Sequence, residues 1–218
     1  MNGKNLALGV AVLLTTTALS GQHAEASICE TDDISLTIGA TTWYASSCTD
    51  GITQGGGPSV ESAAINTGLG TNLTFIAKSN NAAPGTGSLD GIQFTVDTDS
   101  GSSGGWTLSW SDTNGSALAN LPAQIDLAIG IFGGNNGAAY LFDDLVLPAV
   151  PGSGTGTFAI TFTNNGGNNP AISHFNLLGG NLSTITREVP VPEPTTLALL
   201  GSALLGLWYV RRRHAGAP

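Results

Sequence analysis

Two pairs of aspartates are the side chains of this chain whose spacing could do chemistry. Asp143 and Asp144 are adjacent, and Asp97 lies two residues before Asp99. Two carboxyl groups that flank a glycosidic bond can hydrolyse it, one as an acid and the other as a base or nucleophile. A turn rich in Asp and Gly accounts for each pair more simply. We therefore predict turns and no catalytic residue, and we keep a carbohydrate-active enzyme that uses an Asp pair as an alternative.

The pair Asp97 and Asp99 also raises the question of calcium binding. Asp97, Asp99 and Gly101 have the spacing that begins an EF-hand loop, but Leu108 occupies the twelfth position, where such a loop needs an acidic residue. We therefore predict a hairpin turn here, and neither a metal nor a cofactor in the chain. Asn114 begins an N-glycosylation sequon, and the Asn-Gly pair that it forms with Gly115 favours a hairpin turn instead.

His174 is the one histidine between residues 27 and 188. A serine or cysteine nucleophile needs a base within hydrogen-bond reach, and histidine is the side chain best suited to this at neutral pH. His174 belongs to a predicted strand, with parity opposite to that of Phe175 and Leu177, so we expect a structural or exposed histidine. No His-Glu-x-x-His motif and no phosphate-binding loop is present. The sequence therefore predicts a protein that is not an enzyme.

Cys29 and Cys48 are the two cysteines of the chain. In an exported protein, which the signals described below predict, such a pair is typical of a disulfide. Two thiols alone offer too few ligands for a structural metal. We predict that the two residues are bridged, that neither is catalytic, and that the closed loop stabilises the fold by about 3 kcal/mol through the unfolded state.

The segment that must position these side chains, residues 27–188, consists of predicted β-strands. Apolar and polar residues alternate there, the pattern of antiparallel strands buried on one face. The apolar positions are Leu73, Phe75 and Ala77; Ile92, Phe94 and Val96; Trp106, Leu108 and Trp110; Ile125, Leu127, Ile129 and Ile131; Phe158, Ile160 and Phe162; Phe175 and Leu177. With Gly-rich turns between them, about seven or eight strands predict an all-β fold, an antiparallel and jelly-roll-like β-sandwich. A short helical or irregular insertion is expected around Ser59 to Gly70.

Two groups of residues bear on binding. Aromatic faces can stack on sugar rings, and the candidates are Trp43, Tyr44, Trp106, Trp110 and Tyr140. For the two tryptophans that share the parity of Leu108, core packing is favoured. An ice-binding or adhesive module is a further alternative, suggested by a row of threonines at Thr155, Thr157, Thr161 and Thr163. Ice binding would require the row to repeat on neighbouring strands, and the sequence shows no such repeat.

Charge restricts the partners of this segment. Residues 27–186 contain one basic residue, Lys78, and twelve acidic residues, so that one minus twelve gives a net charge of −11 with His174 neutral. Such a surface repels nucleic acid and anionic lipid. It is compatible with a neutral polysaccharide or with divalent cations.

Both ends of the chain carry targeting signals. Residues 1–26 combine a positive start at Lys4, an apolar stretch from Leu6 to Leu14, and a small-x-small cleavage site formed by Ala24 and Ala26. This order predicts a secretory signal peptide. The chain is therefore divided into a signal peptide, a sandwich ectodomain at residues 27–188, and a tail at residues 189–218.

The tail has three consecutive parts. In residues 189–194 proline alternates with valine and glutamate, which favours an extended backbone. Residues 195–210 are apolar or small and uncharged, and they approach the length of roughly 17 residues that a transmembrane helix needs. The basic end, residues 211–214, contains Arg211, Arg212 and Arg213, which are expected to stop transfer on the cytoplasmic side. We predict a single transmembrane helix that holds the protein in the inner membrane.

This tail resembles the bacterial PEP-CTERM sorting signal. The resemblance rests on one ordered set of residues, namely Val191, Pro192, Glu193 and Pro194, then Thr195 to Gly201, then Arg211 to Arg213. It implies an exosortase-type processing enzyme as a partner, and a Gram-negative host that makes exopolysaccharide. It also implies that the protein is anchored in the inner membrane before processing, reaches the cell surface or the extracellular matrix afterwards, and has a role in biofilm.

The segment before the tail resembles exported proteins of the PEP-CTERM class more loosely. The matching pieces are Gly105-Trp106, Leu127 to Phe142, Gly156 to Phe158, and Ile172 to Leu177. This resemblance implies a secreted sandwich and names no activity.

Overall fold

The computed structural model describes residues 29–80, 83–113, 120–150 and 152–185, together with Ser202 to Leu205, Trp208, Arg211 and Arg212 of the tail. The predicted signal peptide with Ala24 and Ala26, the motif Val191 to Pro194, and Arg213 lie outside the described residues, as does most of the predicted helix at 195–210. Across the part of the chain that the structure describes, no helix has the length and apolar character needed to cross a membrane.

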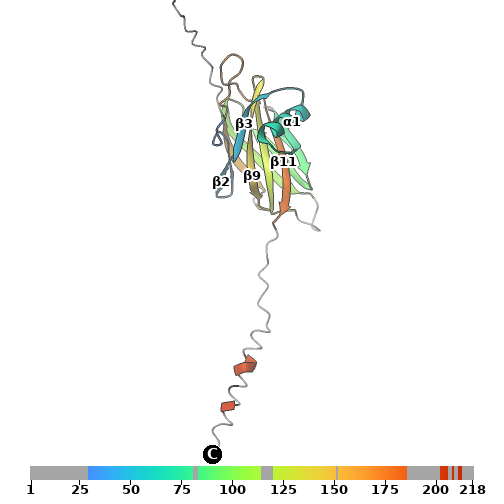
Figure 1. Ribbon diagram of the computed structural model, residues 1–218, viewed down its shortest axis with the longest axis vertical. Helices are drawn as coiled ribbons and strands as arrows, with labels where there is room; N and C mark the ends of the chain where they lie inside the picture. The colour runs from blue at the N-terminus through green and yellow to red at the C-terminus, as the bar shows by residue number, and fades with distance from the viewer. Residues whose placement is uncertain are drawn as a thin grey trace, which may run out of the picture.

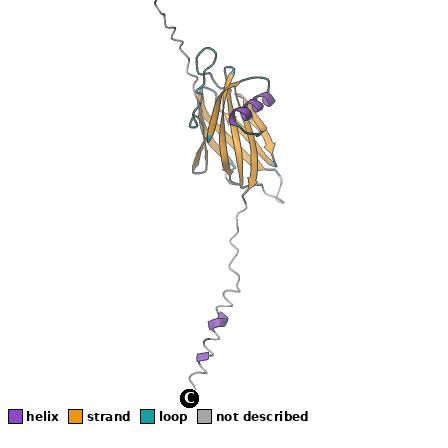
Figure 2. Cartoon of the chain, viewed as in Figure 1, coloured by secondary structure: helices purple, strands orange, loops and turns teal. Residues whose placement is uncertain are grey.

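Two antiparallel sheets pack face to face, as the sequence predicts (Figures 1 and 2). The six-stranded sheet has the order β2-β1-β10-β7-β6-β5, with β1 Ser35–Ile38, β2 Thr41–Tyr44, β5 Gly85–Leu89, β6 Ile92–Thr98, β7 Ser103–Asp112 and β10 Ser153–Ala159. The five-stranded sheet has the order β3-β9-β8-β11-β4, with β3 Ser47–Thr53, β4 Thr74–Asn80, β8 Ala123–Gly133, β9 Asn136–Leu147 and β11 His174–Thr184. Between residues 29 and 185 the described part of the chain is all-β apart from one helix.

The sandwich core lies between the sheets. Side chains of alternate residues from both sheets meet there, and the largest include Phe94, Trp106, Tyr140, Phe142 and Phe175. The other face of the six-stranded sheet is polar and open to solvent, because the strands alternate strictly between buried and exposed positions. The described strands, the disulfide and the sandwich core all lie between residues 29 and 185, so we expect this segment to fold by itself.

A single helix, α1 (Pro58–Leu69), covers the outer face of the five-stranded sheet over β3, β9 and β11 (Figure 1). Pro58 suits the first helical turn, where no backbone N–H donor is required. Gly70 ends the helix in the left-handed conformation, and its N–H donates to the Asn66 carbonyl. The side chain of Asn66 then bonds both backbone groups of Leu73, which fixes the helix end to the start of β4. The insertion predicted around Ser59 to Gly70 is therefore a helix.

A second, smaller core fills the space between α1 and the sheet. Ile65 of the helix packs there with Ile52, Leu73, Ala128, Phe132, Ala139 and Leu178. Gly130 on β8 makes this approach possible, since a Cβ atom at this position would lie 2.6 Å from Cδ1 of Ile65. The five-stranded sheet is thus buried on both faces beneath the helix.

The structure corrects the strand prediction in two respects. The described residues form eleven strands, more than the seven or eight predicted. Alternation did not reveal β2, β3, β5 and β9, because β2 and β5 are short edge strands, β3 is polar, and β9 is apolar on both faces. The strand predicted from Phe158 to Phe162 ends at Ala159. Ile160 and Phe162 nevertheless remain buried in the sandwich core, in an irregular segment.

Candidate functional site

A buried polar cluster lies beneath α1. Its centre is Glu61 in the first helical turn, which is 1% exposed. His174 Nε2 lies 3.0 Å from Oε2 of Glu61, Asn176 Nδ2 donates to the same oxygen at 2.8 Å, and Lys78 Nζ lies 3.7 Å away. The other carboxylate oxygen accepts the backbone N–H of Gly55 at 3.1 Å. One carboxylate therefore joins the helix to β11, β4 and the loop before α1.

The protonation states in this cluster follow from its contacts. Burial by itself raises the pKa of Glu61, but the hydrogen bonds from Asn176, His174 and Gly55 together with the charge of His174 outweigh it, and the pKa lies below its ordinary value. Burial lowers the pKa of His174 against the opposing pull of Glu61, and Lys78 lowers it further. At neutral pH Glu61 is therefore ionised and His174 is neutral, with its proton on Nε2 facing Glu61.

Ser173, His174 and Glu61 form the hydroxyl–imidazole–carboxylate order of a hydrolase triad. Ser173 Oγ lies 3.0 Å from His174 Nδ1. Because Nε2 carries the proton, Nδ1 accepts, and the hydroxyl donates to it. Two contacts hold this chain in place, since Gln54 Nε2 donates to Ser173 Oγ at 2.8 Å and the His174 ring stacks on Phe132 at 4.7 Å. The histidine is 3% exposed, so a substrate has no direct access to its ring.

The strand pattern correctly predicted that His174 and Phe175 point to opposite faces of the sheet. His174 is buried, so the prediction of a structural histidine is confirmed and the exposed alternative is wrong. Sequence reasoning missed Glu61 and Asn176. A signal was present, because Glu61 precedes Ile65 by one helical turn and therefore lies on the same face as that apolar residue. Asn176 likewise shares the strand parity of His174.

Asp143 and Asp144 do not lie in a turn, which corrects the prediction. They belong to β9 where its pairing with β8 shifts register, and Asp144 has a φ of 55°. The carboxylate of Asp126 on β8 joins them, and one ligand atom from each of the three lies within 4.8 Å of the others. Asp126 accepts from the Asp144 N–H at 2.9 Å and from Asn181 Nδ2 at 2.6 Å. These hydrogen bonds give the three aspartates a structural role, because they connect neighbouring strands where the β8–β9 pairing shifts register.

The carboxyl groups of Asp126 and Asp143 shift each other's pKa in opposite directions. Burial raises the pKa of Asp126, but hydrogen bonds from Asp144, Asn181 and Asp143 outweigh this effect and lower it. The hydrogen bond with Asp126, and the charge of that residue, raise the pKa of Asp143. The first proton to leave this pair is therefore that of Asp126.

Asp99 lies at the β6–β7 hairpin, as predicted for a turn. Its Oδ2 accepts the N–H of Gly105 at 2.8 Å, and its own N–H donates to the Gly105 carbonyl at 2.9 Å. The stretch from Gly101 to Gly105 has the spacing Gly-x-Ser-x-Gly, but it begins β7 and no helix follows it, so it is not a nucleophile elbow. Asp97 projects from β6 onto the outer face of the six-stranded sheet.

The outer face of the six-stranded sheet consists mainly of hydroxyl side chains, and we call it the hydroxyl face. Its Ser and Thr residues are Ser35, Thr37, Thr42, Thr86, Ser88, Thr95, Thr107, Ser109, Ser111, Ser153, Thr155 and Thr157. The predicted row is thus shorter on β10, because Thr161 and Thr163 lie beyond its end. Threonines do repeat on the neighbouring strands β1, β2 and β7, which corrects the expectation that the row stands alone.

The strand register aligns these hydroxyl groups in rows. One row crosses the sheet through Thr42, Thr37, Thr155, Thr107 and Asp97. A second row passes through Ser153, Ser109, Thr95 and Thr86. Three hydroxyl pairs bond across strands, Ser35 with Thr157, Thr37 with Thr42, and Thr86 with Thr95.

Three hollows open on the same face. The central one has a volume of about 260 Å³ and is lined by Asp97, Asp99, Gly105, Thr107 and Thr155 among others. A neighbouring hollow is lined by Thr31, Asp32, Ser35, Tyr44 and Thr157, and a smaller one of about 110 Å³ by Gln93, Thr95, Ser109, Trp110 and Ser111. The register places them diagonally across the sheet, from β2 to β6.

The aromatic candidates divide between core and surface. Trp106 and Trp110 are buried, as their parity predicts, and each indole N–H donates to a backbone carbonyl, of Ser35 and of Pro148. Tyr140 is also buried, so its proposed role in sugar stacking is wrong. Trp43 packs against the core, whereas Tyr44 is 58% exposed at the edge of the hydroxyl face.

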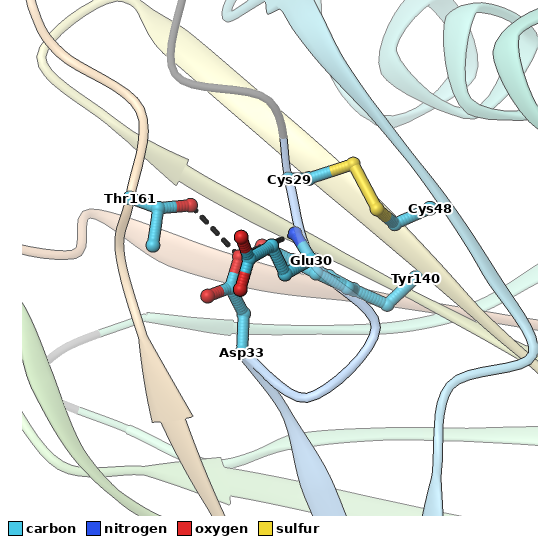
Figure 3. The surroundings of a disulfide bond; sticks show 6 residues. All are labelled: Cys29, Glu30, Asp33, Cys48, Tyr140 and Thr161. Atoms are coloured by element: carbon cyan, nitrogen blue, oxygen red, sulfur yellow. Dashed lines mark hydrogen bonds between the residues drawn. A yellow bond between two sulfur atoms is a disulfide. The ribbon is translucent and has the colours of Figure 1, made fainter.

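Cys29 and Cys48 form the predicted disulfide, with their Cα atoms 6.1 Å apart (Figure 3). Beside it, the Asp33 carboxylate accepts hydrogen bonds from Tyr140 at 3.1 Å, Thr161 at 2.8 Å and the Glu30 N–H at 3.0 Å. Burial and the charge of Asp33 raise the pKa of Tyr140. The bridge and this carboxylate together hold the first described residues against β3 and β9.

In the tail, the described residues Ser202–Leu205, Trp208, Arg211 and Arg212 are helical. Leu204, Leu205 and Trp208 are exposed large apolar side chains, and the Arg212 guanidinium lies 5.3 Å from the Trp208 ring centroid. This distance allows a cation–π contact between the two side chains.

Comparison with known proteins identifies the tail. Residues 190–213 match the family model of the PEP-CTERM protein-sorting motif. The match covers the proline-rich segment, the apolar stretch and the three arginines in the order that the sequence predicted. No curated protein and no solved structure matches the chain.

Proposed function

We propose that this chain is a non-enzymatic protein of the cell surface or extracellular matrix that associates with exopolysaccharide after an exosortase-type enzyme has processed its tail. The observation that carries the proposal is the PEP-CTERM motif at residues 190–213. The motif follows an acidic all-β domain, so the part that an exosortase would deliver is the sandwich.

The charge of the sandwich supports a neutral polysaccharide as the associated material. Lys78 is the one basic residue between residues 27 and 186, and it is engaged with Glu61 on the five-stranded sheet. Nucleic acid and anionic lipid would meet only repulsion from such a surface. A neutral chain of sugars carries no charge and is bound through hydroxyl groups and apolar faces.

The geometry of the polar groups supports a non-enzymatic role. The Ser173 hydroxyl accepts from Gln54 and donates to a histidine that lies under α1. The Asp126 carboxylate is bonded to the Asp144 N–H and to Asn181 of the same sheet. A hydrolase would need a nucleophile or an acid–base pair open to substrate.

The proposal is tested in a host with and without its exosortase. We expect the intact sandwich in the extracellular polysaccharide fraction of the first strain and in the inner membrane of the second. Purified protein should release no sugar from the host polysaccharide. Turnover that is lost in Ser173→Ala or Asp143→Asn would establish a hydrolase instead, and an unchanged distribution between the two strains would remove the sorting proposal.

A second candidate function is an ice-binding module, and the rows of threonine on neighbouring strands favour it. Regularly spaced hydroxyl and methyl groups on a flat sheet can match a lattice of water. A difference between the melting and freezing points of ice in solutions of the purified protein would establish this function.

A further inference from the structure

We propose that the hydroxyl face is the docking site for a single chain of a neutral polysaccharide, which lies diagonally along the three hollows. This inference rests on the proposed association with exopolysaccharide and specifies its site. It depends on four features of the face: its hydroxyl groups, its central hollow, its exposed aromatic ring and its charge.

The hydroxyl groups match the chemistry of sugars. A Ser or Thr hydroxyl both donates and accepts, as does each hydroxyl of a sugar, so the two surfaces can exchange hydrogen bonds without fixed polarity. The pairs Thr37–Thr42 and Ser35–Thr157 hold their side chains in place before binding. Next to these pairs, on β10 and β7, the hydroxyls of Thr155 and Thr107 have no hydrogen-bond partner among the described residues, and both residues line the central hollow.

A glycine creates the central hollow. Gly105 lies opposite Thr157 on the outer face, and the missing side chain leaves space that a Cβ atom would begin to fill, 3.1 Å from Asp99 Oδ2. Asp97 and Asp99 border this space, and Asp32 borders the next hollow. Carboxylates accept strong hydrogen bonds from hydroxyl donors, so these two hollows can hold a sugar by its hydroxyl groups, and the third offers Gln93 and hydroxyl side chains instead.

Tyr44 provides the apolar contact. It projects from β2 opposite Ser35, lines the hollow at that end of the path, and is 58% exposed. An exposed tyrosine ring offers a flat apolar surface with a polar tip, which fits the face of a pyranose ring. The adjacent Trp43 points into the core and supports the strand from behind.

Charge and length indicate which occupant fits. The face contains carboxylates and no basic side chain among its outward residues, so an anionic glycan is repelled and a neutral one is not. Strands are spaced by about 4.8 Å and alternate residues by about 6.7 Å, so the diagonal across the hollows is on the order of 20 Å. This length accommodates several sugar units of one chain.

The experiment measures binding of the segment 27–188, checked for folding by its thermal melt. The probes are dextran, a soluble β-1,3-glucan and the purified neutral polysaccharide of the host, with alginate as the anionic counterpart. We expect at least one neutral probe to bind and alginate not to bind. The variant Thr107→Val/Thr155→Val should weaken binding about tenfold, because two hydroxyl groups are lost while the shape is kept. Tyr44→Ala should weaken it by a similar factor.

Matched control variants keep the result specific to the face. Thr53→Val and Thr74→Val remove exposed hydroxyl groups from β3 and β4 of the other sheet, and neither should change the affinity. Equal binding by wild type and by the Thr107/Thr155 variant would overturn the assignment of the site, while sorting in the host would still stand. The proposal is also overturned if no neutral probe binds, or if the face variant abolishes an effect on ice growth instead.

Discussion

At the scale of single residues, the most constrained group in the molecule is the carboxylate of Glu61. Three side chains and a backbone N–H surround it, and they come from β11, β4 and the loop before α1. A buried charge is tolerated only when its partners compensate for the loss of water. Here the partners also specify where α1 docks, since a shift of the helix would leave several donors unpaired.

Glu61→Gln tests this role. The substitution removes the charge and directs an amide N–H₂ group toward donors of Asn176 and His174, so we expect the free energy of unfolding to fall by about 3 kcal/mol. Urea-induced unfolding provides the measurement. Glu30→Gln, which changes an exposed carboxylate, should stay within about 0.5 kcal/mol of wild type, and an equal effect of both substitutions would contradict the role of Glu61.

The pH dependence of stability provides a second test at this scale. In the folded state the pKa of His174 lies below its ordinary value of 6.5, and that of Glu61 below 4.5. In both cases the unfolded chain binds protons that the folded chain does not. The contribution of His174 to stability is therefore complete above pH 6.5 and is lost as the pH falls below that value. The contribution of Glu61 is lost as the pH falls below 4.5.

His174→Gln should remove the first part of this decrease, because glutamine does not titrate and its amide can still donate to Glu61. Chemical unfolding between pH 7.5 and 5.5 measures the difference from wild type. A wild-type protein with constant stability over this interval would show that His174 titrates as it does in the unfolded chain.

At the scale of elements, the docking of α1 depends on the absence of a side chain at Gly130. A methyl group there would meet Cδ1 of Ile65 at 2.6 Å and the ring of Phe132 at 2.9 Å. Gly130→Ala should therefore destabilise the fold by about 1–3 kcal/mol. Ile65→Val removes the conflicting Cδ1 atom and alone costs about 1 kcal/mol.

A double-mutant cycle makes this prediction specific. Because the valine leaves room for the new methyl group, the double variant should be more stable than the sum of the two single effects by more than about 0.5 kcal/mol. Unfolding in urea measures all four proteins. Strict additivity would mean that Gly130 and Ile65 do not compete for the same space.

The disulfide acts on the N-terminal elements. It links residues separated by 19 positions, for which loop closure contributes about 3 kcal/mol. Cys29→Ser/Cys48→Ser should lower the melting temperature by roughly 6–12 °C for a domain of this size. Calorimetry of the variant and of wild type measures the effect, and a reductant should lower the melting temperature of wild type alone.

The elements also show how far sequence analysis reaches. Alternation identified β6, β7, β8 and β11, because each of these strands has one face in the sandwich core. It failed for β5, whose sequence GTGSL contains almost no apolar side chain, and for β9, which is buried on both faces near α1. The hydroxyl face could not be predicted from one sequence, since its rows combine residues of different strands through a register that only the fold defines.

Candidate site residues divide in the same way. Cys29 and Cys48 could be paired from their number alone, and the tail motif from its linear order. Glu61 and His174 are separated by 113 residues, and nothing in the sequence brings them together. Asp126 joins Asp143 only through the β8–β9 pairing. Features defined by the order of residues along the chain can therefore be predicted from the sequence. Sites that form only when distant strands pair cannot.

At the scale of the whole molecule, the folded sandwich and the sorting motif lie in separate segments of the chain. The sandwich closes on itself between residues 29 and 185, and the tail carries the PEP-CTERM motif at residues 190–213. A change in the motif should therefore alter where the protein goes without altering how it folds.

The last prediction concerns that motif. Prolines hold an extended backbone, and an extended peptide offers its bonds to the cleft of a processing enzyme, whereas a helix or sheet hides them. Replacing Pro192, Glu193 and Pro194 by Ala should therefore leave export and the melting temperature unchanged and keep the uncleaved protein in the inner membrane. Deleting residues 197–218 should release the folded sandwich without sorting.

Intact mass spectrometry of membrane and extracellular fractions, with and without the host exosortase, measures the state of the tail. We expect the arginines to fix the orientation and stop transfer, so retention and recognition would depend on different residues, and the two variants should fail in different ways. If wild-type cells keep the tail, or if the alanine variant loses it equally well, the motif is not recognised by the enzyme, and the tail is a plain membrane anchor.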